Sequence, residues 1–184
     1  MFHALMMTCV DIDTVEMSPE HVVATPAPPK RQDRFAVPAD ISEWASKDLL
    51  QEWLMEEIGS LNWNHPELLA HLRKNPSCHP RELFCLLTYA YATGLFESEE
   101  IVSQSIREPA LRRLLRDYSP SVKEIRRFRK ENRGLLRWAL TQVMKRAIRE
   151  RYDLGNMVPA GIRRRLEEDA TERLVIARHM DGPA

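Results

Sequence analysis

The chain has 184 residues, of which 43% are hydrophobic, and its 27 basic side chains are balanced by 27 acidic ones. This length and composition allow one well-packed core and exclude two large domains. A neutral chain argues against a nucleic-acid partner, but the charge is unevenly distributed. Fifteen basic and only five acidic residues lie between Ile101 and Arg151, a local net charge of +10. This asymmetry predicts a localised anion-binding surface.

The first part of the chain differs in composition from the rest. Residues 1–39 contain five prolines and no sustained apolar period, which predicts a flexible leader, disordered or extended. From Asp40 onward the apolar spacing is helical throughout, so we expect an all-α, compact multi-helix bundle over residues 40–155 and an amphipathic C-terminal helix within residues 156–184. The predicted helices run from a cap at Asp40 or Ser42 to about Gly59, and over residues 65–75, 79–94, 98–106, 109–118, 121–132, 134–155 and 159–180.

The three cysteines, Cys9, Cys78 and Cys85, include no close-spaced pair, which is typical of reduced thiols in a cytoplasm rather than of a disulfide framework. Cys78-His79 with Cys85 has no second close Cys/His pair, and we expect neither a metal ion nor another cofactor. No basic stretch precedes an apolar run at the N-terminus, and no apolar run approaches about 18 residues. We therefore expect no secretory signal and no membrane association.

The stretch SPSVKEIRRFRKENRG combines a regular apolar spacing with many basic side chains. On a helix, Val122, Ile125 and Phe128 fall on one arc and most of the basic residues on nearly the opposite arc. Ser119 as N-cap and Pro120 in the first turn predict where this helix begins. One face can therefore pack on a core while the other meets a polyanion.

Three short helices with tight connections, over residues 98–132, match a helix-turn-helix-like unit, in which one helix enters the major groove of DNA. The candidate reading helix covers residues 121–132, with residues 109–118 as the alternative. No nucleophile stands beside a base, so we predict no catalytic residue. The candidate DNA-binding residues are Arg112, Arg113, Arg116, Lys123, Arg126, Arg127, Lys130, Arg133 and Arg137. The competing interpretation is a solvated charged face.

Arg129 stands apart from the other basic residues, because it projects between Val122 and Ile125 on the apolar side of the predicted helix. A buried guanidinium without a partner is prohibitive in free energy. We therefore expect a structural ion pair, with Glu108 or Asp117 as the partner, or an escape to solvent, in preference to a DNA contact.

Several motifs between residues 79 and 136 occur in a recognisable order. A helix that begins with proline leads to Gly94-Leu95-Phe96-Glu97-Ser98, then to Leu111-Arg112-Arg113-Leu114, and then to Ile125-Arg126-Arg127-Phe128-Arg129. In this order and spacing they resemble the N-terminal domain of bacterial insertion-sequence transposases of the DDE type. The resemblance covers about a third of the chain.

The resemblance implies an all-helical domain that recognises terminal-repeat DNA and takes part in transposase assembly. In such enzymes a ribonuclease H-like domain with three metal-binding acids follows, whereas only about thirty residues follow Arg151 here. We therefore expect no enzymatic activity, since the strands that would hold two metal ions have no room.

The leading hypothesis from the sequence is a non-catalytic, transposase-derived DNA-binding protein, the product of a truncated or domesticated transposase. The alternative is a helical protein–protein interaction module or a regulatory subunit of a separate transposase. The expected partner is double-stranded DNA, with a second copy of the chain or a transposase as the other candidates. The expected location is the cytoplasm, at the bacterial nucleoid when DNA is bound.

Overall fold

The structure is a computed structural model that describes residues 35–61, 64–66, 70, 80–155 and 157–182. Within these residues every regular element is helical, which confirms the predicted all-α class. The elements are η2 (Ile41–Glu43), α1 (Lys47–Gly59), α3 (Pro80–Ala92), α4 (Ser98–Arg107), α5 (Pro109–Leu115), α6 (Val122–Glu131), α7 (Arg133–Tyr152) and α8 (Ala160–Met180). Residues 1–34 of the predicted leader and most of the predicted helix over 65–75 lie outside the described ranges. No described helix is both long and apolar enough to cross a bilayer.

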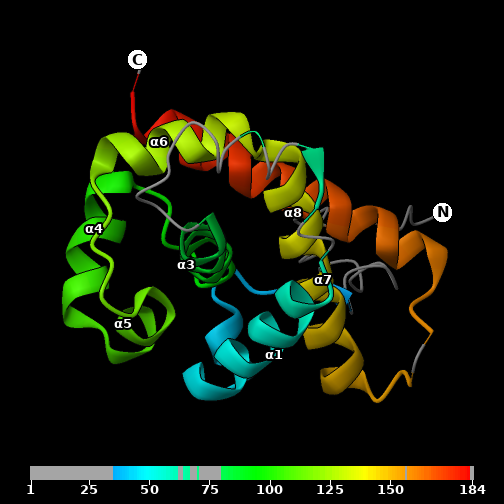
Figure 1. Cartoon of the computed structure of the whole chain (residues 1–184). Coiled ribbons are helices and arrows are strands. Elements are labelled where there is room, and N and C mark those ends of the chain that lie inside the picture. Colours follow the sequence, from blue (N-terminus) through cyan, green and yellow to red (C-terminus); the bar gives the residue numbers. More distant parts are fainter. Residues whose placement is uncertain (1–34, 62–63, 67–69, 71–79, 156, 183–184) are drawn as a thin grey trace, which may run out of the picture.

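Helix α3 lies at the centre of the bundle, surrounded by the other helices (Figure 1). Its hydrophobic sequence predicts a central position, and every residue from Leu83 to Ala92 is buried. Helices α1 and α7 pack on one side of α3, and α4 and α5 lie on the other. Helices α6 and α8 lie across the top in this view, and α8 runs along α7.

Helix α8 belongs to the same core as the rest of the bundle. Its buried side chains join one continuous apolar cluster that begins at Ile41. They are Leu166, Ala170, Leu174 and Ala177. The predicted C-terminal amphipathic helix therefore forms, and its apolar face is part of the domain interior.

Two predicted helix caps are wrong. The first predicted helix is divided, because Asp40 accepts a hydrogen bond from the Ser42 amide at 2.8 Å and caps only η2, while Ser46 caps α1. Helix α6 begins after Ser121, in agreement with the predicted range of 121–132, and its N-cap is not Ser119, because the side chains of Ser121 and Glu124 form a reciprocal capping box. The Ser-x-x-Glu spacing of that box is a stronger start signal than Ser-Pro.

The last residues of the predicted leader pack on the bundle. The ring of Phe35 lies 5.0 Å from that of Tyr152 in an edge-on arrangement. The buried guanidinium of Arg173 donates hydrogen bonds to the carbonyl oxygens of Pro38 and Ala39, at 2.6 and 2.7 Å. Residues 35–39 therefore pack against α7 and α8.

Cys85 is buried and forms no disulfide, as the predicted reduced state requires, whereas Cys9 and Cys78 lie outside the described residues. Burial raises the pKa of the Cys85 thiol to about 12, so the thiol stays protonated at neutral pH. The part of the chain that the structure describes contains no group of three or more His, Cys, Asp or Glu that could hold a metal ion.

Candidate nucleic-acid interface

Helix α6 has the two-faced character that its sequence predicts. Ile125 and Phe128 are fully buried, and the Phe128 ring packs edge-on against Phe84 with centroids 6.4 Å apart. Lys123 and Lys130 are exposed to solvent on the other side. The buried face fixes the helix to the core, so its basic face is held in one orientation.

The candidate residues of α5 lie apart from those of α6. Helix α5 packs on α1, α3 and α4, whereas α6 packs on α3, α4 and α7. The two helices adjoin opposite ends of α4 (Figure 1), whose ten residues span about 15 Å. Arg112, Arg113 and Arg116 therefore form a separate group on the α5 side of the molecule.

The α5 group is partly neutralised by α1. Arg113 forms an ion pair with Asp48 and donates a hydrogen bond to Gln51 at 3.1 Å. Arg112 and Arg116 are exposed. Arg116 closes the helix with a positive φ of 56°, which residues other than glycine rarely adopt.

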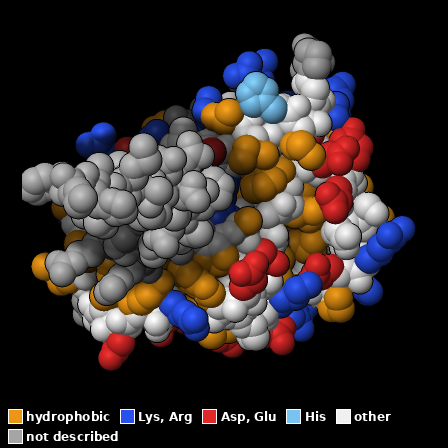
Figure 2. All heavy atoms as spheres, turned by 180° about the vertical axis from the view of Figure 1, so that it is seen from behind, with side chains coloured by type: hydrophobic (Ala, Val, Ile, Leu, Met, Phe, Trp, Pro, Cys, Tyr) orange, Lys and Arg blue, Asp and Glu red, His pale blue; other side chains and the backbone are white. Residues whose placement is uncertain are grey.

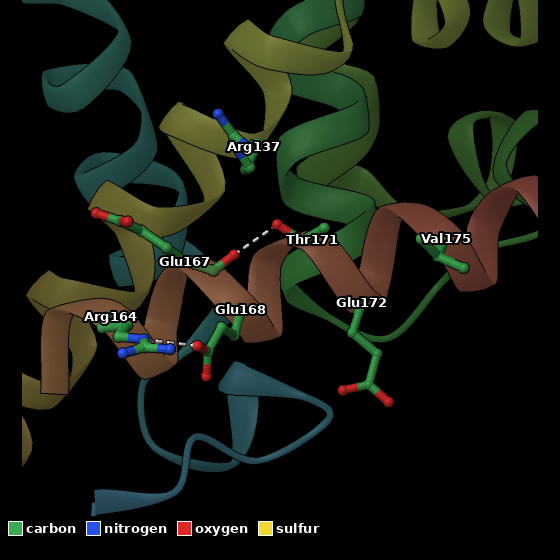
Figure 3. A pocket seen from close by; sticks show the side chains of 7 residues that line it. All are labelled: Arg137, Arg164, Glu167, Glu168, Thr171, Glu172 and Val175. Carbon is green, nitrogen blue, oxygen red and sulfur yellow. Dashed lines mark hydrogen bonds and ion pairs between the residues drawn. The ribbon is translucent and has the colours of Figure 1, made fainter. Parts of the chain in front are cut away.

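Arg137 lies beside an acidic part of α8. It lines an open pocket of about 530 Å³ together with Glu167, Glu168 and Glu172. Figure 3 shows these side chains, with Arg164 paired to Glu168 at 2.9 Å. Two arginines and three glutamates give this pocket a slight excess of negative charge, which makes it a poor place for a polyanion, although Arg137 is itself exposed.

A third group gathers at the junction of α6, α7 and α8. It lines a cavity of about 510 Å³, which we call the basic pocket. The pocket collects five cationic side chains and one carboxylate from these elements and from the residues just after α8. Its lining residues are Arg126, Arg129, Lys130, Arg133, Leu174, Arg178, Asp181 and Gly182.

Arg129 makes the expected structural ion pair, but with Asp181 rather than with Glu108 or Asp117. Its side chain is 8% exposed and that of Asp181 is 5% exposed. Glu108 pairs instead with Lys47 at 2.5 Å. The sequence distance of 52 residues between Arg129 and Asp181 explains why helical spacing did not identify this partner.

Asp181, the carboxylate of the basic pocket, has several partners. Besides Arg129, it lies 3.3 Å from Nε of Arg126. It also accepts hydrogen bonds from the Ser98 amide at 3.0 Å and from the Ser98 hydroxyl at 2.8 Å, at the first residue of α4. Arg126 forms a second ion pair, with Glu99 at 2.6 Å. These contacts join the end of α8 to α4 and α6.

The remaining cations of the basic pocket are less constrained. Lys130, Arg133 and Arg178 are exposed and make no ion pair with any described residue. Arg178 did not belong to the predicted set, because it lies in the C-terminal helix, outside the strongly basic segment. The sequence around Arg178 does not indicate that this residue lies close to α6.

On the face opposite to that of Figure 1, basic and acidic side chains are interspersed among apolar ones (Figure 2). The visible described surface there carries no continuous basic area. The nine predicted residues are thus divided among the α5 group, the pocket that Arg137 shares with α8, the exposed face of α6 and the basic pocket, and Lys130 belongs to both of the last two.

Comparison with protein families adds independent information on this region. The model of the family described as Transposase domain (DUF772) matches residues 52–131. The match extends from within α1 to the last residue of α6, so it includes the basic face of α6 and ends just before α7. Searches among curated proteins and among solved structures found no match. The family match supports a transposase-related protein.

Proposed function

We propose that this chain is a transposase-derived protein that binds duplex DNA through the basic face of α6, without itself cutting or joining strands. One observation carries the proposal: Lys123 and Lys130 are exposed and free of ion pairs among the described residues, on a helix whose opposite side is buried. The transposase domain match, which covers all of α6, agrees with this assignment.

The length of the basic face suits a DNA groove. Lys123 and Lys130 are seven residues apart, which on an α-helix is about two turns, or about 10.5 Å. The major groove of B-DNA is about 12 Å wide. A helix placed across or within the groove therefore presents its two lysines to phosphates on both sides, and Arg127 lies between them on the same face.

Salt dependence of binding to a random-sequence duplex tests the proposal. Five phosphate contacts, from Lys123, Arg127, Lys130, Arg133 and Arg178, predict a log–log slope of about −4.5. Fluorescence anisotropy between 50 and 200 mM salt measures it. Absence of binding at the lowest salt would overturn the proposal.

A double variant distinguishes DNA binding by the α6 face from non-specific attraction by the overall charge of the protein. Lys123→Ala with Lys130→Ala should reduce the magnitude of the slope by about 1.8. The matched control is Arg163→Ala, an exposed arginine in the first turn of α8, which should leave the slope unchanged. Both variants should keep the wild-type thermal midpoint, since the altered side chains are exposed.

A regulatory subunit or protein-interaction module is the second candidate function. Exposed apolar side chains on α8 favour it, because Ile176 and Met180 lie one turn apart on the same side of the helix and both are exposed. Sedimentation of the full chain, alone and mixed with duplex DNA, distinguishes the two. Self-association without any DNA binding would favour the interaction module.

A further inference from the structure

We propose that the basic pocket between α6, α7 and α8 is a binding site for a phosphate group. The identity of the ligand in the cell, a phosphate of a DNA strand, rests on the proposed function. Binding of a phosphate group in the pocket does not depend on it. The site lies at the edge of the α6 face and includes Arg178, a residue outside the transposase domain match.

The charge balance of the pocket favours an anion. Asp181 is its one carboxylate, and it is buried and already shared by Arg129, Arg126 and the start of α4. Its charge is therefore neutralised within the protein. The excess positive charge belongs to Lys130, Arg133 and Arg178. None of these three side chains forms an ion pair with a described residue.

Each of these three cations stands on a helix that is fixed in the core. Phe128, two residues before Lys130, is fully buried, and so is Ala177, next to Arg178, while Leu136 on α7 is only 1% exposed. The backbone positions of the donors are thus set before any ligand arrives, which reduces the ordering cost of binding. Arginine donors also suit the oxygens of a phosphate, which they can bind in a bidentate manner.

The start of α7 contributes a guanidinium to the pocket, because Arg133 is its first residue. Asn132 ends α6 and begins α7, so the partial charges of these two helix ends largely cancel, and the positive charge here is that of the side chain. At the other side of the pocket, Arg178 and His179 in the last turn of α8 oppose the partial negative charge of that helix end.

The shape agrees with a small ligand rather than with a flat surface contact. A volume of about 510 Å³ falls in the range of about 300–1,000 Å³ typical of ligand pockets. One phosphate group with its attached sugar fits such a volume. The pocket adjoins the α6 face, so a strand bound there can place one backbone phosphate in it.

The first experiment uses the full chain and inorganic phosphate. Thermal unfolding is measured in phosphate and in chloride at equal ionic strength. At ten times the dissociation constant, phosphate should raise the midpoint by roughly 3–6 °C relative to chloride. Arg178→Ala should abolish this difference, and the control Arg163→Ala should keep it. No phosphate-specific shift, or a full shift in Arg178→Ala, would overturn the proposal.

The second experiment identifies the source of the phosphate. Arg178→Ala is titrated with duplex DNA at several salt concentrations. A slope smaller by about 1 assigns the pocket to a strand phosphate, whereas an unchanged slope, together with the lost phosphate shift, assigns it to a free phosphate compound. Both results support phosphate binding in the basic pocket. The α6 double variant tests DNA binding separately, so failure of the pocket and failure of the proposed function remain distinguishable.

Discussion

We predict that the ion pair between Arg129 and Asp181 contributes strongly to the free energy of unfolding. Asp181→Ala leaves the Arg129 guanidinium, which is 8% exposed, without its carboxylate. Removing one partner of a buried pair costs about 3–5 kcal/mol, because the other charge stays buried and unpaired. The substitution also removes the acceptor for the Ser98 amide at the start of α4, a capping contact worth about 1 kcal/mol. We expect a total loss of about 4–6 kcal/mol.

Urea unfolding at equilibrium measures this loss, and two variants define its origin. Asp181→Asn keeps an oxygen for the Ser98 amide and removes only the charge, so its loss should be smaller, at about 3 kcal/mol. Glu168→Ala breaks a surface pair, with Arg164, whose side chains are 83% and 61% exposed. That control should cost less than about 0.5 kcal/mol. If Asp181→Ala costs no more than this control, the pair does not stabilise the fold.

Two further predictions concern α6. Phe128→Ala should cost about 3–5 kcal/mol in urea unfolding, because the ring is fully buried against Phe84; a loss below about 1 kcal/mol would contradict this packing. Desolvation alone would raise the pKa of Glu124, but hydrogen bonds from Ser121 outweigh it and lower the pKa. The stability that Glu124 adds over Glu124→Gln is therefore present above the unfolded pKa of about 4.3 and lost as pH falls through the lower folded value. Thermal midpoints of both proteins at pH 7 and pH 3 test this, and a gap that does not narrow at pH 3 would refute it.

The sequence predicts the fold well where one signal dominates. The continuous apolar stretch after Pro80 predicts a central helix, and α3 is that helix, with Gly94 following its end at a φ of 75°. The predictions fail where two start signals compete, as at Ser119 and Ser121. There the side chain three residues later decides, because Glu124 closes the capping box only with Ser121.

The site is harder to predict than the fold, because it depends on which helices meet in space. Helical periodicity places Lys123 and Lys130 on the exposed side of α6, as the structure has them. It cannot tell that Arg137 shares a pocket with three glutamates of α8, or that Arg178 joins Lys130 in another pocket. These neighbours come from packing between distant segments, for which a single sequence carries no local signal.

The end of α8 connects the stability of the domain with its proposed binding surface. Asp181 neutralises Arg129 inside the pocket wall, and Arg178, three residues earlier, supplies a free cation to the same pocket. Undocking of this helix end would expose an unpaired buried charge and remove one phosphate donor at once. Although the transposase domain match ends at residue 131, the surface that we propose for DNA therefore needs α8, which also carries core residues such as Leu174.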